Sequence, residues 1–528
     1  MRLSRLWIGN FKNLHDFEIK FEDPFSFLLG WNGTGKSNLI EAIVIIFRDL
    51  DAKNNNIITN FNYEIEYICG GVNIRIEHSS DANTTKWQTN FYVDGKKISK
   101  KDFLDNREEW QPAHVFAYYS GPSNRLETHF FKPQNQFYNN SIHNKLLPGD
   151  IDKLGKFFYA QPVHSNFVLL SFFCQGKSKV LKSIRKLIDI ERFISALFIL
   201  RKPTDWKKTN PNFFWGAGGL AGEIAQRLYL SALAPIKISN TFYRGFRRHR
   251  EKSEVCFLYL PNQKALRKIS KCRQSYDTDN KYGNWSPRQL FKAFETLYIS
   301  DLLEEVRIKV KVSKLNEPIT FRELSEGEQQ FLTVLGLMEF TKTKESLFLL
   351  DEPDTHLNPR WSMDYVEYLN TVLTRTGNAH VIMATHDPLV ICGLDRQQLH
   401  IFKRDGTSGK VYAEPPDFSP KGMGVGGILT SDIFDLKSQL DNDTNKKLQK
   451  LADLSSKPNL SEGDKHEIKK LRTQLLELGF NDVYRDPKSV LVADLVRLIQ
   501  KRKKSLPAGN AYMNLTVEIE RLIARFLK

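Results

Sequence analysis

The sequence predicts an α/β protein: a mixed β-sheet with flanking helices, an antiparallel β subdomain, a helical insert and a helical C-terminal region. A short apolar run at 25–29 leads into a glycine-rich loop, after which apolar residues recur at helical spacing over 38–50. Two more apolar runs, at 347–350 and 380–384, end in acidic or histidine residues, where α/β sheets present ligands. Alternating and β-branched runs at 63–98 are separated by Gly-Gly and Asp-Gly, which predicts antiparallel hairpins.

A chain of 528 residues is too long for a single core, so several domains are expected. The stretch LKSIRKLIDIERFISALFIL (181–200) has the pattern of an amphipathic helix, and no heptad repeat is sustained around it. The expected segments are a first lobe at 1–130, a basic, mainly helical insert at 131–300, a second lobe at 301–418 and a helical C-terminal region at 419–528.

The C-terminal region opens with GMGVGG, which is typical of a hinge, and helical patterns follow. Its last helix would carry an apolar stripe of Ile519, Leu522, Ile523 and Phe526. Two interpretations stay open: a helix hairpin packed on the rest of the protein, or an arm that docks a partner.

Composition indicates a protein of a reducing compartment, and we expect it in the cytoplasm. No apolar run approaches the roughly 20 residues of a membrane helix, and the N-terminus lacks the apolar region of a secretion signal. The five cysteines are far apart, which disfavours a disulfide framework or a structural zinc site.

The net charge of +16 is unevenly distributed. Residues 171–280 hold 22 Lys and Arg against 8 Asp and Glu, a balance of +14. Within them FYRGFRRHREK places Arg244, Arg247, Arg248 and Arg250 beside aromatic residues, a pattern that can pair phosphates and stack bases. We therefore expect a nucleic-acid surface there; the alternative is a solvated face of the insert.

The loop at 30–37 reads GWNGTGKS and fits the phosphate-binding pattern G-x-x-x-x-G-K-[ST]. Its glycines let backbone N–H groups, including those of Asn32, Gly33, Thr34 and Gly35, converge on phosphate oxygens. The same pattern assigns Lys36 to the β- and γ-phosphates and the Ser37 hydroxyl to Mg²⁺. ATP and Mg²⁺ are thus the expected ligands.

The apolar run at 347–350 ends in Asp351 and Glu352, and the next one ends in Thr385-His386. An acid at a strand end can hold Mg²⁺, so Asp351 is the second metal candidate. Glu352 is a candidate general base for the attacking water, and His386 is a candidate contact to the γ-phosphate.

The tetrapeptide LSEG occurs twice, at 324–327 and 460–463, and both copies fit a helix-capping box. Only the first lies between the phosphate loop and the acidic strand. In that order the motifs resemble the head of ABC-type ATPases of the SMC and RecF kind. The resemblance implies two heads joined head to tail, as a dimer or a higher even oligomer. It also implies that Ser325 and Gly327 reach the γ-phosphate of the neighbouring head, with Glu352 as base and His386 as switch.

The sequence departs from that family at the metal-contacting glutamine that usually follows a strand after the phosphate loop. The best positional candidate, HVFAYYSGPSNR (114–125), has Tyr119, Ser120 and Gly121 instead. The spacing Asp441-Asn442-Asp443 lies in a polar helical stretch without the strand that an OLD-type nuclease requires. No intrinsic nuclease is therefore predicted.

A narrower resemblance includes MRLSRLWIGNFKNL, VFAYYSGPSNRLE, FRELSEGEQQFLTVLGL, DEPDTHLNPRW and ATHDPLVICGL. These stretches are similar to restriction-associated bacterial ATPases, including PtuA of Septu and retron antiphage systems. The resemblance implies control of a PtuB-like HNH nuclease and, in retron versions, association with a reverse transcriptase and its DNA–RNA product. The alternatives are a RecF- or SMC-like repair ATPase without a nuclease, and a slow nucleotide sensor or scaffold.

Overall fold

The computed structural model describes residues 1–51, 59–80, 86–123, 125–134, 156–175, 188–203, 214–244, 249–271, 285–313, 315–341, 345–373, 379–434, 436, 438, 440–457 and 460–478. The chain divides into two compact units, Met1–Phe434 and Asp435–Lys528. Each unit is considered by itself. None of the helices in these described ranges is both long and apolar enough to cross a membrane.

The first lobe contains a six-stranded antiparallel sheet in the order β2-β1-β4-β5-β6-β7. Gly70 and Gly71 join β4 to β5, and Asp94 and Gly95 join β6 to β7, all four with positive φ. Two-residue turns of this kind match the twist of the paired strands, so the predicted hairpins are confirmed. The strands are β1 (Arg2–Phe11), β2 (Leu14–Lys20), β4 (Tyr63–Cys69), β5 (Val72–Ser80), β6 (Trp87–Val93) and β7 (Lys96–Ile98), and short helices α2 (Lys100–Asp105) and α3 (Arg107–Trp110) follow.

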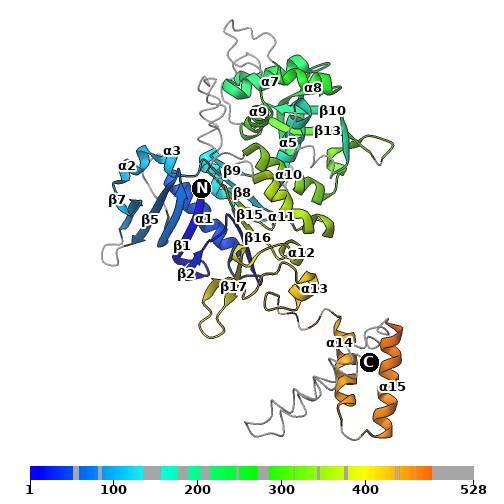
Figure 1. The fold of residues 1–528 in the computed structure, drawn as a ribbon. Coiled ribbons are helices and arrows are strands. Elements are labelled where there is room, and N and C mark those ends of the chain that lie inside the picture. Colours follow the sequence, from blue (N-terminus) through cyan, green and yellow to red (C-terminus); the bar gives the residue numbers. More distant parts are fainter. Residues whose placement is uncertain are drawn as a thin grey trace. The chain divides into compact units, whose positions relative to one another are not determined.

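The central sheet has seven strands in the order β18-β17-β3-β16-β15-β8-β9 (Figure 1). All neighbours in it are parallel except β18, which pairs antiparallel with β17 at one edge. The carboxyl ends of β3, β16, β15 and β8 therefore meet at one edge of the sheet. The strands are β3 (Phe25–Gly30), β8 (His114–Tyr119), β9 (Phe157–Tyr159), β15 (Ser346–Asp351), β16 (Ala379–Ala384), β17 (Leu399–Arg404) and β18 (Val411–Glu414).

Alternate residues of the central sheet enter two different cores. Leu347 and Leu349 of β15 pack with α1 (Lys36–Asp51) and the antiparallel sheet of the first lobe. Phe348 and Leu350 face the other way, toward the helical side. The helices of that side are α10 (Glu326–Thr341), α11 (Pro359–Leu373) and α12 (Pro388–Ile391). The sheet is buried on both faces, as parallel sheets usually are.

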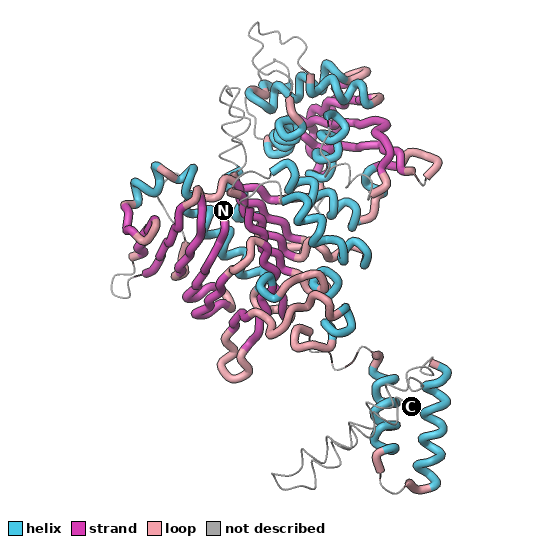
Figure 2. The backbone as a smooth tube through the Cα atoms, viewed as in Figure 1, coloured by secondary structure: helices cyan, strands magenta, loops and turns pink. Residues whose placement is uncertain are grey.

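The insert contains strands as well as helices (Figure 2). Its strands β11, β12 and β10 form a five-stranded antiparallel sheet with β13 and β14 of the second lobe, in the order β11-β12-β10-β13-β14. The helix expected over 181–200 is wrong in its second half, because that half belongs to the central strand β10. The strands are β10 (Ile190–Arg201), β11 (Ile236–Arg244), β12 (His249–Leu260), β13 (Leu303–Val312) and β14 (Ile319–Thr320), and the helices are α5 (Val163–Gln175), α7 (Gly219–Ser231), α8 (Gln263–Ser270) and α9 (Pro287–Ile299).

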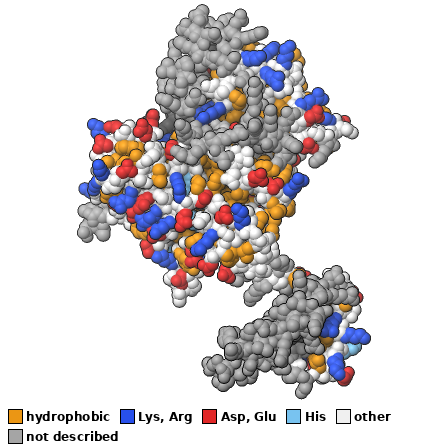
Figure 3. All heavy atoms as spheres, in the orientation of Figure 1, with side chains coloured by type: hydrophobic (Ala, Val, Ile, Leu, Met, Phe, Trp, Pro, Cys, Tyr) orange, Lys and Arg blue, Asp and Glu red, His pale blue; other side chains and the backbone are white. Residues whose placement is uncertain are grey.

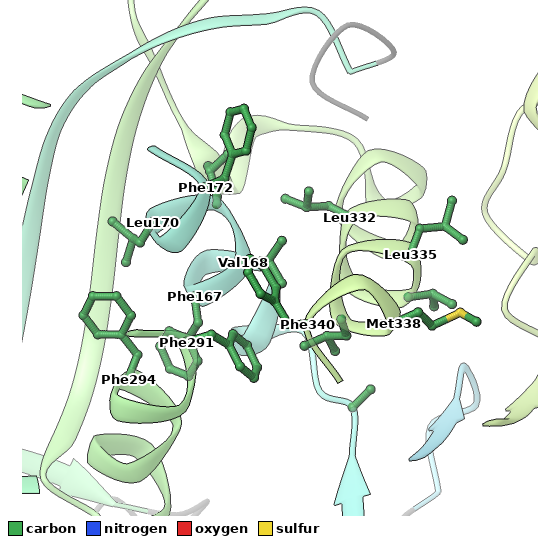
Figure 4. Close-up of a cluster of buried hydrophobic side chains, with 14 of the residues drawn as sticks. Phe167, Val168, Leu170, Phe172, Phe291, Phe294, Leu332, Leu335, Met338 and Phe340 are labelled. Atoms are coloured by element: carbon green, nitrogen blue, oxygen red, sulfur yellow. The ribbon is translucent and has the colours of Figure 1, made fainter. Parts of the chain in front are cut away.

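The insert and the second lobe share one apolar core. Figure 4 shows side chains of α5, α9 and α10 meeting there, with Phe167 and Phe291 between Phe294 and Phe340. The Phe291 and Phe340 rings are stacked, with centroids 5.5 Å apart. This core fixes α10, the helix that begins within the first LSEG at Glu326, on the helical face of the central sheet.

The first unit extends past the expected boundary at 418, as far as Phe434. Residues of the predicted hinge form helix α13 (Gly424–Leu429), whose Ile428 is buried in the core of the first unit. The hinge interpretation is therefore wrong. In the second unit, α14 (Asn442–Ser455) and α15 (Glu462–Glu477) form a hairpin around Leu451, Leu471 and Leu475. The stripe predicted at 519–526 lies outside the described residues.

Candidate active site

The glycine-rich loop joins β3 to α1 at the carboxyl edge of the central sheet. Gly35 has φ +103°, and a Cβ there would lie 2.9 Å from Asn13 Oδ1. Gly30 has φ +146°, and a Cβ there would lie 2.5 Å from the Phe402 carbonyl oxygen. Larger residues would thus strain the loop and push it off its neighbours. Asn32 and Gly33 are exposed, whereas Thr34 is buried and donates from Oγ1 to the Trp31 carbonyl, 2.8 Å away.

Lys36 lies at the first position of α1 and is almost completely buried. Its Nζ donates to the Gly30 carbonyl oxygen at 2.7 Å, so the side chain runs back along the loop. Burial lowers the pKa of Lys36, and the negative charges of Glu352 and Asp351 oppose that change. The lysine therefore lies within the field of both acids predicted for the site.

Asp351 ends β15 and is 1% exposed. Neither carboxylate oxygen has a hydrogen-bond partner within the described part of the chain. Burial raises the pKa of Asp351 to about 6, and the nearby Ser37 hydroxyl opposes that rise. A buried carboxylate beside a hydroxyl suits a hard divalent cation such as Mg²⁺, which needs one or two protein ligands and completes its shell with water and phosphate. The described residues contain no cluster of three or more acidic, His or Cys side chains that could hold a metal ion.

Glu352 follows Asp351 in a left-handed backbone conformation, with φ +53°. Its Oε1 lies 3.3 Å from Nδ1 of His386, which comes after β16. This contact lowers the pKa of Glu352 and raises the pKa of His386. Both side chains remain partly exposed, at 31% for Glu352 and 56% for His386, so water can reach the carboxylate.

The two LSEG copies have the same local structure but lie in different units. Ser325 Oγ accepts from the Glu328 N–H at 3.3 Å, while Glu328 Oε2 accepts from the Ser325 N–H at 2.8 Å. Ser461 and Asp464 form the same reciprocal pair at the start of α15. The capping box predicted for both is confirmed. Only the first copy lies in the unit that holds the phosphate loop.

The structure brings together five of the predicted site residues: Lys36, Ser37, Asp351, Glu352 and His386. Two of the predicted nucleic-acid residues, Arg244 and Arg250, lie elsewhere, in strands β11 and β12, where Arg244 pairs with His249 in the register of the two strands. Arg250 is the second residue of β12, and Arg247 and Arg248 lie outside the described residues.

Helix α8 adds exposed basic side chains to the described part of the insert. They are Lys264, Arg267 and Lys268, and Lys271 follows the helix. Figure 3 shows Lys and Arg side chains over this part of the molecule, whereas both signs of charge intermix over the first lobe.

Two protein-family models match the chain. Residues 1–161 match an AAA ATPase domain, and residues 171–391 match a model described as AAA domain, putative AbiEii toxin, Type IV TA system. The first match contains Lys36 and Ser37, and the second contains Asp351, Glu352 and His386. Both matched models describe AAA domains, and between them they contain all five residues of the cluster.

Curated relatives match parts of the chain. The Septu protein PtuA of Bacillus mycoides is 28% identical over 195 residues, which is 35% of this chain and 27% of that protein. The DNA replication and repair protein RecF of Glaesserella parasuis is 30% identical over 151 residues, 26% of this chain and 42% of RecF. The chain thus spans less than half the length of these relatives. Among solved structures, the SMC head domain from Thermotoga maritima aligns over 79% of this chain and 100% of that chain, with 14% identity and a TM-score of 0.33.

Sequence reasoning missed several residues that shape the site of the ATPase domain. Asp354 is buried and accepts a hydrogen bond from the Thr385 hydroxyl, which ties the acidic turn to the end of β16. Ser120, in the position where a glutamine was sought, contacts Thr355 Oγ1 at 3.1 Å. Gln330 of α10 reaches the turn after Glu352. The string DTHLNP was the available signal for the turn, but its partners come from distant segments.

A cavity of about 700 Å³ lies beside the acidic turn of the domain. It is lined by the end of β8, by α10 and by His356, together with Tyr159, Gln161 and Tyr298. Lys36 and the phosphate loop are not part of its lining. The cavity is therefore distinct from the cluster around Lys36 and Asp351.

Proposed function

We propose that this protein binds and hydrolyses ATP between two copies of its head, joined head to tail, and uses that cycle to control a partner nuclease in antiphage defence. The observation that carries the proposal is the buried, unpaired carboxylate of Asp351 beside Ser37 and Lys36, with the Glu352–His386 pair next to it. This one cluster therefore supports a place for the phosphates, a place for the metal and a place for the attacking water.

Binding would rest on the phosphate loop. The backbone N–H groups of Asn32, Gly33, Thr34 and Gly35 and the amino end of α1 offer positive potential to phosphate oxygens. On ATP binding, the Lys36 amino group would release its hydrogen bond to the Gly30 carbonyl and donate to a β- or γ-phosphate oxygen instead. Ser37 and Asp351 would hold Mg²⁺, which supplies positive charge against the phosphate oxygens when it is bound.

Hydrolysis would depend on Glu352 and His386. The Glu352 carboxylate accepts a proton from the attacking water, and His386 orients the water and the γ-phosphate. Ser325 and Gly327 of a second copy would close the site by presenting a hydroxyl and the amino end of α10 to that phosphate. The site would then be complete only in the paired state.

The likeness to PtuA supports a role in defence with an HNH nuclease of the PtuB kind as partner. A reverse transcriptase and its DNA–RNA product are further proposed partners, for a retron version of the system. Nucleic acid would contact the basic insert.

A second candidate function is DNA repair without a nuclease effector, and the likeness to RecF favours it. Binding assays with an HNH protein encoded beside this chain separate the two functions. A stable complex whose nuclease activity changes with ATP supports defence, and failure to bind any such protein favours repair. Slow turnover with tight binding would instead indicate a nucleotide sensor or scaffold.

The ATPase proposal is tested with Lys36→Ala and Glu352→Gln. Lys36→Ala should abolish ATP binding, because it removes the only charge that the loop itself contributes. Glu352→Gln should bind ATP but accumulate as a closed dimer, because the amide cannot accept the proton from water. Nucleotide binding, phosphate release and solution mass are measured for each. Hydrolysis by Glu352→Gln at the parental rate would rule out Glu352 as the base.

A further inference from the structure

Gln330 of α10 holds both ends of the turn that follows the acidic strand. The side chain is buried, at 5% exposure. Its Nε2 donates to the Glu352 carbonyl oxygen at 3.4 Å, and its Oε1 accepts from the His356 N–H at 3.2 Å. A glutamine amide carries a donor and an acceptor, so a single side chain can close the turn in this way.

The first turn of α10 lies directly against the same segment. A Cβ at Gly327 would lie 2.3 Å from the His356 carbonyl oxygen, which only a shift of backbone could relieve. His356 Nδ1 also lies 3.4 Å from Glu326 Oε2. The amino end of α10 and the turn at 352–356 are therefore in contact at several points within one chain.

The backbone of Glu352 needs such support. Its φ of +53° lies in the left-handed region, which is strained for a non-glycine residue. The Glu352 N–H donates to the Ala384 carbonyl at 2.9 Å, and its carbonyl accepts from Thr355 Oγ1 at 2.7 Å as well as from Gln330. Thr355 belongs to the turn itself, whereas Gln330 brings support from a separate helix.

We propose that Gln330 is a positioning residue that fixes the general base Glu352 to the helix α10 of the same chain. This inference rests on the proposed function. In a head-to-tail pair, α10 contacts the nucleotide of one site while Glu352 of the same chain serves the other. A rigid link between them means that closing one site aligns the base of its partner site. Gln330 thereby couples the two ATP sites.

The test uses Gln330→Met, which keeps the length of the side chain but loses both hydrogen bonds. Thr333→Val is the matched control, because Thr333 is equally buried on the same helix and its hydroxyl donates only to the Gln329 carbonyl in the described contacts. ATP affinity, kcat, the Hill coefficient for ATP hydrolysis and the urea midpoint are measured for each variant. We expect Gln330→Met to lower kcat roughly tenfold and to bring the Hill coefficient toward 1, with ATP affinity within about twofold of the parent. Thr333→Val should keep kcat within about twofold.

The possible results distinguish a wrong proposed function from a wrong coupling role for Gln330. If the parent protein binds ATP without turning it over, the proposed function is wrong and the coupling role falls with it. If the parent hydrolyses ATP and Gln330→Met matches it in kcat and Hill coefficient, only the coupling role is wrong. Parallel loss of kcat, affinity and urea midpoint would reduce Gln330 to a structural residue. Should Gln330→Met fail to fold, Gln330→Glu decides, since it keeps the acceptor for His356 and loses the donor to Glu352.

Discussion

Glu41 should be the most costly single carboxylate to neutralise near the phosphate loop. It lies on α1 with 5% exposure. Lys12 Nζ lies 2.6 Å from both of its oxygens, Arg125 Nη2 lies 2.7 Å from Oε2, and His129 Nε2 lies 3.3 Å from Oε1. Replacing Glu41 with Gln leaves Arg125, which is 27% exposed, and Lys12, which is 43% exposed, without their counter-charge.

The magnitude follows from the pKa of Glu41. Burial raises that pKa, but the contacts with His129, Lys12 and Arg125 outweigh burial and lower it from 4.5 to about 2. Each unit of pKa corresponds to about 1.4 kcal/mol, so the ionised contacts stabilise the fold by on the order of 3 kcal/mol. Because the pKa is lowered in the folded state, this stabilisation is complete above about pH 4.5 and is lost as the pH falls toward 2.

Urea unfolding followed by tryptophan fluorescence measures this quantity. All eight tryptophans lie within residues 1–434, so the signal reports the first unit alone. Glu41→Gln should lower the free energy of unfolding by about 3 kcal/mol at pH 7, and the difference from the parent should shrink below about pH 4.5. The control is Glu414→Gln, which removes an exposed ion pair with Lys403 and should cost less than about 1 kcal/mol. A Glu41→Gln loss as small as that of the control, or one that stays constant with pH, would refute the reasoning.

Four further predictions concern the first LSEG, the second LSEG, the metal contact and the basic insert. Ser325→Arg should abolish ATP-dependent dimerisation and hydrolysis with an unchanged circular dichroism spectrum, since the cation would enter the facing phosphate site; dimers at the parental level would contradict this. Ser461→Ala should cost the second unit about 0.5–2 kcal/mol by chemical denaturation and leave turnover unchanged. Asp351→Asn should remove the dependence of ATP binding on Mg²⁺ concentration, and a parental Mg²⁺ titration would exclude Asp351 as a metal contact. The double change of Arg247 and Arg248 to Glu should weaken binding of DNA and RNA and flatten the salt dependence by about 0.7–0.9 per lost contact, with ATP binding intact; an unchanged slope would mark a solvated face.

The placement of the candidate site residues was predictable, because local sequence determines most of it. The loop at 30–37 needs only the strand before it and the helix after it, and the structure has β3 and α1 there. Asp351 and His386 each follow an apolar run, and parallel pairing of β15 with β16 brings the two strand ends together. Glycines at 70 and 71 likewise form a turn whatever lies around them.

The insert was not predictable in the same way. The run IERFISALFILR can be a buried helix or a buried strand by pattern alone, since apolar residues occupy both periods. The run forms strand β10 because it pairs with β12 and β13, whose paired residues lie more than 50 positions downstream. The polar contacts of the acidic turn were unpredictable for the same reason, because Gln330 and Ser120 reach the turn from separate elements.

The two LSEG copies show that a local motif alone does not determine whether a segment belongs to a functional site. Both begin a helix through the same exchange of hydrogen bonds, so neither the motif nor its capping distinguishes them. Their glycines differ in surroundings: a Cβ at Gly463 would meet only Ser461 Oγ at an ordinary 3.7 Å, whereas a Cβ at Gly327 would strike the His356 carbonyl. A capping box tolerates many residues at its third position, but a helix packed against an acidic turn requires glycine there. The contact across the fold, rather than the tetrapeptide, therefore distinguishes the first copy from the second, in keeping with the proposal that only the first serves ATP hydrolysis.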